Sequence, residues 1–367
     1  MKPNTTLRFE GKQVLVVGAT GGLGGAYLRA FAAEGALVAA AVRDPARLQV
    51  GAQGPSAPRL VFAVDVEDPA SIHTLAEQLE AALPELSVVV NATGYDVRKP
   101  LAEHTLAELD RTLDVNLRGA FLLTQALLPL LTRNAGMLVH SGGFADGRLA
   151  FPFYSADVAS RAGLRSMVEA INRELAGSGA LVGYFSPSPA DTAAERPFHA
   201  LWEKMGTPIV PVDAVAAALL NAVARRRPAA VMGGWPAVTF ARLNAAFPAL
   251  ADLLLMRRYT AQMREFFGVG APAQRAQSDK TPSTGLQVIA IALIVASFLL
   301  YGVGLLVVPF LALPGLDAAS KTGLVALSLA LGEVTFWVGA ALVGSSVIRR
   351  YRAYFNPCRW FASGGSQ

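Results

Sequence analysis

The chain has 367 residues, of which 53% are hydrophobic and only 16% charged, so it is long enough for a full α/β domain and more apolar than most soluble proteins. Its formal net charge of +5 does not indicate nucleic-acid binding, because the basic residues form no single stripe with interleaved aromatic side chains. The single cysteine, Cys358, excludes an intrachain disulfide, and the scattered histidines lack metal-ligand spacing. We therefore expect neither a metal site nor a nucleic-acid partner.

Apolar runs alternate with segments of helical periodicity over residues 1–235. Strands are predicted at 13–17, 36–42, 60–64, 87–90, 137–139 and 181–185, and helices at 23–34, 75–83, 106–131 and 159–176. This alternation with short connections predicts an α/β domain with a doubly wound parallel sheet of the Rossmann type.

The segment 197–211 is irregular and carries large apolar side chains, among them Phe198 and Trp202. It can be a lid over a lipophilic site or a plain helical excursion that packs on the domain, and the sequence leaves both open. Residues 236–268 are predicted to form an amphipathic helical extension. Residues 269–285, rich in Gly, Pro, Ala, Gln and Ser, are predicted to be a linker.

The first predicted strand leads into a glycine-rich turn that opens a helix. The turn reads Gly18-Ala19-Thr20-Gly21-Gly22-Leu23-Gly24. Missing side chains let a pyrophosphate approach the backbone, and the helix N-terminus supplies N–H donors and a positive dipole. A tight structural turn is the alternative, but the context of strand, turn and helix favours a dinucleotide site.

The choice of dinucleotide depends on the end of the second strand. An arginine there attracts a ribose 2′-phosphate, whereas a carboxylate would bond the free 2′-hydroxyl and repel the phosphate. Arg43 occupies this position and favours NADP(H) over NAD(H). Asp44 follows directly and would weaken that preference if it turned inward.

From about Lys12 to Thr192 these motifs, in this order, resemble the short-chain dehydrogenase/reductase family. Its glycine turn matches Gly18, Gly22 and Gly24, its adenine-contacting aspartate matches Asp65, its Asn-Asn-Ala-Gly is similar to Asn91-Ala92-Thr93-Gly94, its helix asparagine matches Asn116, and its Pro-Gly with a nicotinamide-side threonine appears as Pro187-Ser188 with Thr192. The resemblance implies a cofactor site built from Gly18, Thr20, Gly21, Gly22, Leu23, Gly24, Arg43, Asp65, Val66, Asn91, Ala92, Gly94, Pro187 and Thr192.

In that family a serine hydroxyl polarises the substrate carbonyl, a tyrosine exchanges the proton, and a lysine one helical turn later lowers the tyrosine pKa. An unperturbed tyrosine titrates at about 10, so proton transfer needs this electrostatic help. The resemblance thus implies a hydride transfer between a nicotinamide and a carbonyl or alcohol carbon.

Two registers compete for the catalytic residues. Pairing Ser141 with Tyr154 keeps the family's serine-to-tyrosine spacing but places Val158 at the lysine position. Matching Ser160-Arg161-Ala162 to the family's Ser-Lys-Ala places Arg161 at the lysine position and Asp157 at the tyrosine position, without a matching serine.

Tyr154 and Arg161 are two helical turns apart and share a helix face, so arginine can partly replace lysine, although the exchange is not conservative. The candidate catalytic residues are Ser141, Tyr154, Asn116 and Arg161. The alternative is a family member that keeps cofactor binding but has lost or altered the chemistry.

After Lys280 the sequence changes character. Nearly uninterrupted apolar residues run over 286–313 and 323–348, each longer than the roughly 20 residues that span a bilayer. The short loop 314–321 between them predicts a transmembrane hairpin of two helices within 286–350, followed by a tail at 351–367. Buried core helices are a weaker alternative at these lengths.

The arginines at 349, 350, 352 and 359 flank the exit of the hairpin, so the positive-inside rule places both of its ends in the cytoplasm. The polar start of the chain gives no signal peptide, which also keeps the Rossmann domain in the cytoplasm. These features predict a multi-pass membrane protein, and a bacterial inner membrane fits them.

A carboxylate, Glu333, lies inside the second expected span, where charged groups are costly and usually paired or functional. Ser297 and Tyr301 in the first span are its candidate hydrogen-bond partners. We expect Glu333 to have a structural role.

The leading hypothesis is a membrane-anchored NADP(H)-dependent oxidoreductase that acts on a carbonyl or alcohol of a lipophilic small molecule. One alternative is a catalytically silent, membrane-tethered NADP(H)-binding module that senses redox state or scaffolds a partner. Another makes the hairpin an assembly or transport accessory. The resemblance also raises a homo-oligomer, because family members are often dimers or tetramers.

Overall fold

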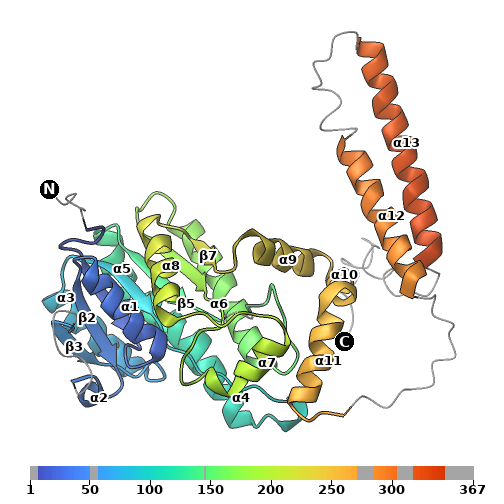
Figure 1. Cartoon of the computed structure of the whole chain (residues 1–367). Coiled ribbons are helices and arrows are strands. Elements are labelled where there is room, and N and C mark those ends of the chain that lie inside the picture. Colours follow the sequence, from blue (N-terminus) through green and yellow to red (C-terminus); the bar gives the residue numbers. More distant parts are fainter. Residues whose placement is uncertain (1–6, 50–56, 144–145, 271–283, 304–316, 344–367) are drawn as a thin grey trace, which may run out of the picture. The chain divides into compact units, whose positions relative to one another are not determined.

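The computed structural model describes residues 7–49, 57–143, 146–270, 284–303 and 317–343. Seven parallel strands form one sheet in the order β3-β2-β1-β4-β5-β6-β7 (Figure 1). The strands are β1 (Gln13–Val17), β2 (Leu37–Val42), β3 (Leu60–Ala63), β4 (Leu86–Asn91), β5 (Met137–Ser141), β6 (Leu181–Ser186) and β7 (Ala229–Val231). The crossover from β3 to β4 reverses the strand order next to β1, and ligands bind at such a switch point in open parallel sheets.

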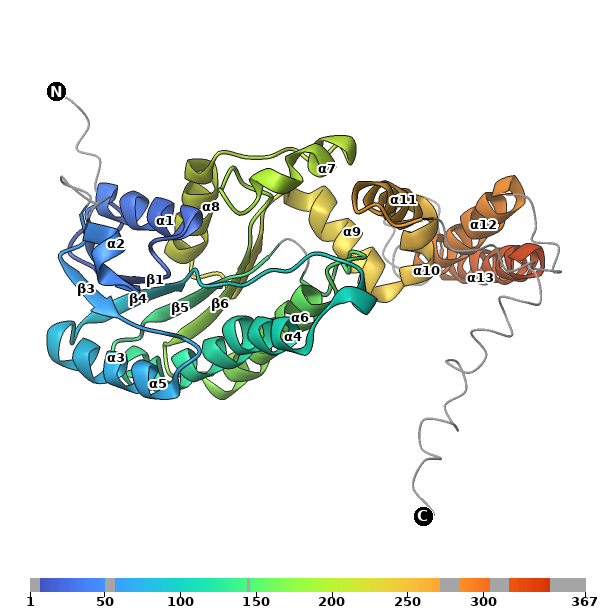
Figure 2. The same ribbon diagram turned by 90° about the horizontal axis from the view of Figure 1, so that it is seen from below.

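Helices cover both faces of the sheet (Figure 2). One face carries α1 (Gly22–Ala33) and α8 (Val212–Ala224), which bury one apolar cluster against the strands. The other carries α3 (Pro69–Ala82), α5 (Gly119–Arg133) and α6 (Ser155–Glu174), which bury a second cluster. Strand side chains alternate between the two clusters, as in β1, where Val14 and Val16 join the first and Leu15 and Val17 the second.

Short elements complete this part of the chain. They are α2 (Pro45–Gln49), η1 (Leu101–Glu103), α4 (Leu106–Leu113), η2 (Asp114–Arg118), η3 (Arg196–Phe198), α7 (His199–Lys204), α9 (Gly234–Ala246), α10 (Pro248–Ala251), η4 (Asp252–Met256) and α11 (Arg257–Phe266). A third apolar cluster joins α7 to α9, α10 and α11 and to the segment before α6, with Phe151, Tyr154 and Trp202 among its buried members. The segment 197–211, for which the sequence left a lid and a helical excursion open, is helical over 197–204 and packs against the helical extension.

The described residues form two compact units, one up to residue 270 and the other from residue 284. In the second unit, α12 (Thr284–Gly302) and α13 (Ala318–Val343) pack side by side (Figure 1). Tyr301 donates a hydrogen bond of 2.6 Å to Glu333, as one of the two predicted partners, and Trp337 donates another of 2.8 Å. The other candidate, Ser297, bonds the Ile294 carbonyl of its own helix instead.

Two helices among the described residues are long and apolar enough to cross a membrane. One is Leu106–Arg133, half buried on the sheet, which makes it a core helix of the first unit. The other is Ser320–Gly339, only 11% buried, which lies within the second expected span. The first expected span is described over residues 286–303, of which 286–302 belong to α12, and the flanking arginines and the tail lie outside the described residues.

The predicted parallel sheet is confirmed, and the six predicted strands match β1 to β6. Helix α3 begins earlier than predicted because the Asp68 side chain accepts a hydrogen bond from the Ala70 amide and Pro69 opens the first turn. No element is predicted where α8 and β7 occur. Strand β7 has three residues, two of them alanine, so it carries almost no strand signal.

Candidate cofactor and active site

The glycine-rich turn passes directly over the end of β4. Gly18 has a φ of +83°, and a Cβ there would lie 3.1 Å from the Ala92 backbone. A Cβ at Gly24 would lie 2.2 Å from the Gly18 carbonyl oxygen. The N-cap of α1, Gly21, makes no side-chain capping bond, and the first turn of α1 holds no acidic residue. This helix end therefore offers uncapped amide donors to an anion.

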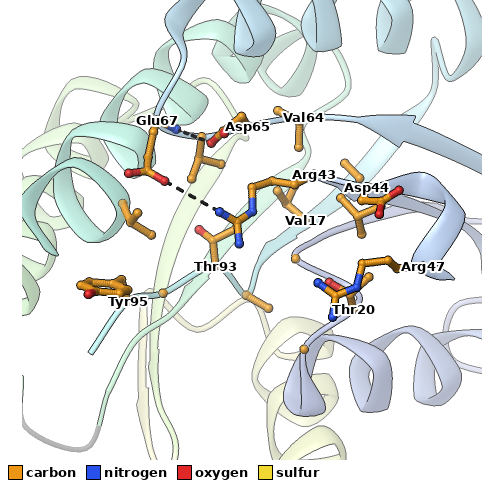
Figure 3. Close-up of a pocket in the computed structure, with 18 of the residues that line it drawn as sticks. Val17, Thr20, Arg43, Asp44, Arg47, Val64, Asp65, Glu67, Thr93 and Tyr95 are labelled. Carbon is orange, nitrogen blue, oxygen red and sulfur yellow. Dashed lines mark hydrogen bonds and ion pairs between the residues drawn. The ribbon is translucent and has the colours of Figure 1, made fainter. Parts of the chain in front are cut away.

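A pocket of about 280 Å³, here the glycine-turn pocket, lies between this turn and the ends of β2 and β3 (Figure 3). Eight of the residues predicted to bind the cofactor line it: Gly18, Thr20, Gly21, Arg43, Asp65, Val66, Ala92 and Gly94. Arg43 points into the pocket with its Nη1 4.0 Å from a Glu67 oxygen, and Arg47 is a second arginine in the wall. Asp44 accepts a hydrogen bond from the Ala46 amide at the start of α2, so its carboxylate is held by its own helix.

Asn91 does not line the pocket, but its side chain holds the loop after β4 that does. Its oxygen accepts bonds from the amide and the hydroxyl of Thr93, and its amide nitrogen lies 3.1 Å from Nδ1 of His140. The other ring nitrogen of His140 lies 2.9 Å from the Thr124 hydroxyl. Burial lowers the pKa of His140 to about 3, so the imidazole is neutral and serves to fix the loop after β4.

A second pocket, here the inner pocket, has a volume of about 220 Å³ and continues past the same loop. Residues 92–94 line both pockets. Its walls include Leu23, Pro187 and Thr192 of the predicted cofactor set and Ser141, Tyr154 and Arg161 of the predicted catalytic set. A Cβ at Gly22 would lie 2.8 Å from the Thr192 methyl group, so the glycine lets the segment after β6 close against α1.

The serine and tyrosine of the first register do not contact each other through hydrogen bonds. The Ser141 hydroxyl lies 2.8 Å from the hydroxyl of Tyr27, on the α1 side of the sheet. Tyr154 is 3% exposed, and its hydroxyl is covered and has no hydrogen-bond partner within the described residues. Burial raises the pKa of Tyr154, which the neighbouring Arg98 only partly offsets, so its hydroxyl stays protonated.

The second register forms a buried ion pair. Arg161 Nε donates to Asp157 at 3.1 Å, and both side chains are less than a tenth exposed. Asn116 donates to Asp157 at 3.3 Å and to the Ser160 hydroxyl at 3.1 Å, while its oxygen and amide also hold the Tyr95 backbone. Burial lowers the pKa of Arg161, but Asp157, Tyr184 and Asp96 together raise it by more, so the guanidinium remains charged. Arg161 and Asn116 are thus joined by Asp157.

Sequence reasoning missed a second charged group in the inner pocket. Arg98 binds both oxygens of Glu195 at 2.7 and 2.8 Å, reaches Asp96 at 2.5 Å, and lies over the ring of Tyr154. Trp202 also donates to Glu195. The partners Arg98 and Glu195 lie 97 positions apart, so no local pattern indicates them. Asp96 follows Gly94 at the end of a strand, and that position could have indicated a pocket residue.

Of the predicted site residues, Gly22, Gly24, Asn91 and Asn116 line neither pocket. Each of them contacts or positions a residue that does line a pocket. Gly22 lies against Thr192 and Gly24 against Gly18, while Asn91 holds Thr93 and Asn116 reaches Arg161 through Asp157. The other predicted residues gather along one continuous edge, at the carboxyl ends of the parallel strands. That edge can hold an extended anionic dinucleotide, with the inner pocket at one end.

Residues 12–200 match the short chain dehydrogenase family, and the chain belongs to this family. The predicted resemblance over about residues 12–192 is therefore confirmed. The match does not extend to the second unit.

Among curated relatives, the chain is 33% identical over 189 residues to the ketoacyl reductase HetN of Nostoc sp., covering 50% of this chain and 64% of the relative. It is 31% identical over 185 residues to D-threitol dehydrogenase of Mycolicibacterium smegmatis, covering 49% of this chain and 71% of the relative. A crystal structure of a short chain dehydrogenase from Burkholderia cenocepacia in complex with NADP superposes with a TM-score of 0.57 at 26% identity, over 67% of this chain and 98% of that one.

Proposed function

We propose that this protein is a membrane-anchored, NADP(H)-dependent oxidoreductase that transfers a hydride to or from a carbonyl or alcohol carbon of a lipophilic small molecule. The observation that carries the proposal is the pair of adjoining pockets that share residues 92–94. One pocket suits a dinucleotide phosphate, and the other places polar side chains beside its end. A family neighbour that has been crystallised with NADP supports the choice of cofactor.

The residues present fit NADP(H). The chain's own backbone leaves no room for side chains at Gly18 and Gly24, and the turn that they shape exposes the backbone of Gly18 and Gly21 in the pocket, where a pyrophosphate would approach it. Arg43 and Arg47 supply positive charge at the end of β2, where the 2′-phosphate would lie, while Asp44 is held by α2. When bound, the nicotinamide supplies or accepts the hydride.

Four side chains are proposed to bind the substrate or to position the cofactor. Tyr154, which stays protonated, donates a hydrogen bond to the substrate oxygen after a rotation that uncovers its hydroxyl. Arg161 lies beside Gly94 and keeps the ribose end of the cofactor in place, and Asn116 positions it through Asp157. Ser141 lines the pocket and is oriented by Tyr27.

The lipophilic character of the substrate and the membrane anchor rest on two observations. Trp202 lines the inner pocket, which lies against the third apolar cluster. In the second unit, large apolar side chains of α12 and α13 face outward, including Phe298 at 58%, Val334 at 62% and Trp337 at 61% exposure. Water would not favour such a surface, but acyl chains would. We further propose that both ends of the hairpin face the cytoplasm.

The test begins with the full chain, which should remain in alkali-washed membranes and be extracted with detergent. NADPH consumption is then followed with a panel of long-chain aldehydes, ketones and quinones. Tyr154→Phe should lower turnover by about 10²- to 10³-fold, as for other lost transition-state hydrogen bonds, with NADPH affinity unchanged. Tyr259→Phe, in the same apolar cluster but outside the inner pocket, is the matched control and should stay within about twofold of wild type.

A second candidate function is a silent NADP(H)-binding module. It is favoured by the closed Arg161–Asp157 pair and by the covered Tyr154 hydroxyl. Binding of NADPH without consumption of any panel compound would establish this candidate in place of the first.

A further inference from the structure

The groups in the inner pocket that can carry a proton differ in how accessible they are. Tyr154 is 3% exposed and Asp157 is 4% exposed. The Glu195 side chain is 14% exposed, with both oxygens bound to Arg98. The Asp96 side chain is 30% exposed, although it too contacts Arg98. Among these acidic groups, the Asp96 carboxyl is therefore the most accessible to a ligand in this pocket.

The position of Asp96 also suits a role in the reaction. It lies two residues after Gly94, which lines both pockets, on the loop that leaves the carboxyl end of β4. Asp96 lines the inner pocket together with Gly94 and Tyr154. Hydrogen bonds to the Asn91 side chain and from the Tyr95 amide hold this loop, so the backbone directly before Asp96 is fixed in place.

Charged groups surround Asp96 from three elements. Arg98, on the same loop, donates to it from Nε, Asp157 and Arg161 face it from α6, and Glu195 lies across Arg98. Burial raises the pKa of Asp96 to about 6, with Asp157 adding to the rise and the two arginines opposing it. Such a carboxyl exchanges protons near neutral pH, whereas Tyr154 holds its proton much more tightly.

We propose that Asp96 is the general acid and base of the inner pocket, an assignment that rests on the proposed oxidoreductase function. In the reductive direction, the carbonyl carbon accepts a hydride with its electron pair from NADPH, and the π pair moves to the oxygen. That oxygen takes the proton of the Asp96 carboxyl, whose O–H electrons stay on the carboxylate beside Arg98. Water returns a proton through the accessible side of Asp96. Oxidation of the alcohol runs these steps in reverse.

The experiment uses the detergent-solubilised full chain with NADPH and decanal, or the panel compound turned over fastest. For reduction, kcat/KM should be constant below about pH 6 and fall about tenfold per pH unit above it, because the acid form is required. For oxidation of the matching alcohol with NADP+, the rate should instead rise through the same range. Asp96→Asn should lose at least about 10²-fold of kcat/KM and this pH limb.

A readout independent of turnover is the titration of carboxyl carbons in protein labelled with 13C at aspartate Cγ. One resonance should titrate near pH 6 and be missing in Asp96→Asn, while NADPH affinity stays within about threefold. Asp213→Asn, at a side chain 84% exposed and outside both pockets, is the control for the substitution. Asp96→Glu keeps a carboxyl and should retain part of the rate with a pH limb, which covers the case in which the asparagine variant misfolds.

An active wild type whose Asp96→Asn variant keeps its rate and pH profile overturns the role of Asp96 alone. A resonance of Asp96 that titrates near the ordinary value of about 4 does the same. A wild type that binds NADPH but turns over no panel compound at any pH overturns the proposed function, and the assignment of Asp96 with it.

Discussion

The two adjoining pockets of the Rossmann unit are built in different ways. The glycine-turn pocket is made mainly by short segments at the ends of β1, β2, β3 and β4, where the turn is shaped by glycines and the Arg43 side chain is 62% exposed. The inner pocket is made by ion pairs and hydrogen bonds between distant segments, such as Arg98 with Glu195 and Asn116 with Asp157. The shape of the glycine-turn pocket is therefore set mainly by the backbone, and that of the inner pocket mainly by buried charged side chains. The two should respond differently to substitution.

The largest effect is expected in the inner pocket, from Arg161→Met. It leaves Asp157 buried without its counter-ion, which costs about 3 to 5 kcal/mol. In a unit of this size that is a fall in Tm of roughly 10 °C, measured by calorimetry on the transition of the Rossmann unit.

The same substitution on the same helix provides the control. Arg173 pairs with Glu169 at the same spacing, but the arginine side chain is 74% exposed, so Arg173→Met should cost less than about 0.5 kcal/mol. Adding Asp157→Asn to Arg161→Met should recover much of the lost stability. Equal effects of the two arginine substitutions would contradict the claim that burial makes the Arg161–Asp157 pair important for stability.

A smaller effect is expected from Gly24→Ala in the glycine turn. Its Cβ would lie 2.2 Å from the Gly18 carbonyl oxygen, so the turn must shift at a cost of about 1 to 3 kcal/mol. NADPH affinity, measured by fluorescence titration, should fall about tenfold or more.

Gly25 is the neighbouring control, since a Cβ there would lie 3.3 Å from the Ala19 carbonyl oxygen and needs little adjustment. Gly25→Ala should bind NADPH within about threefold of wild type, because the helix gains from alanine what the contact loses. Wild-type affinity in Gly24→Ala would contradict the importance of backbone shape in this pocket.

The smallest effect is expected from Arg43→Ala, because Arg43 is 62% exposed and shares its pocket with Arg47. Loss of a charge-assisted phosphate bond should weaken NADPH binding by about tenfold and leave NADH binding within about twofold. Arg29→Ala, at an exposed arginine on α1 outside both pockets, should change neither. If Arg43→Ala lowers the affinity for NADH as much as the affinity for NADPH, Arg43 does not recognise the 2′-phosphate.

The sequence by itself determined the parallel sheet and the place of its glycine turn, because strand periodicity and the need for glycine at Gly18 and Gly24 are local properties. It also indicated two candidate partners for Glu333 in the first apolar helix, of which Tyr301 forms the hydrogen bond and Ser297 does not. The sequence did not decide between the two catalytic registers, because both assign the tyrosine and lysine positions of the family to the same short segment.

Only the tertiary structure decided what surrounds the inner pocket. It turned the Ser141 hydroxyl toward Tyr27, closed Asp157 on Arg161, and left Asp96 as the accessible carboxyl. These outcomes depend on which chain segments meet at the carboxyl edge of the sheet and on how far each side chain is withdrawn from water. Burial and charge pairing are properties of the whole fold, so no sequence motif carries them.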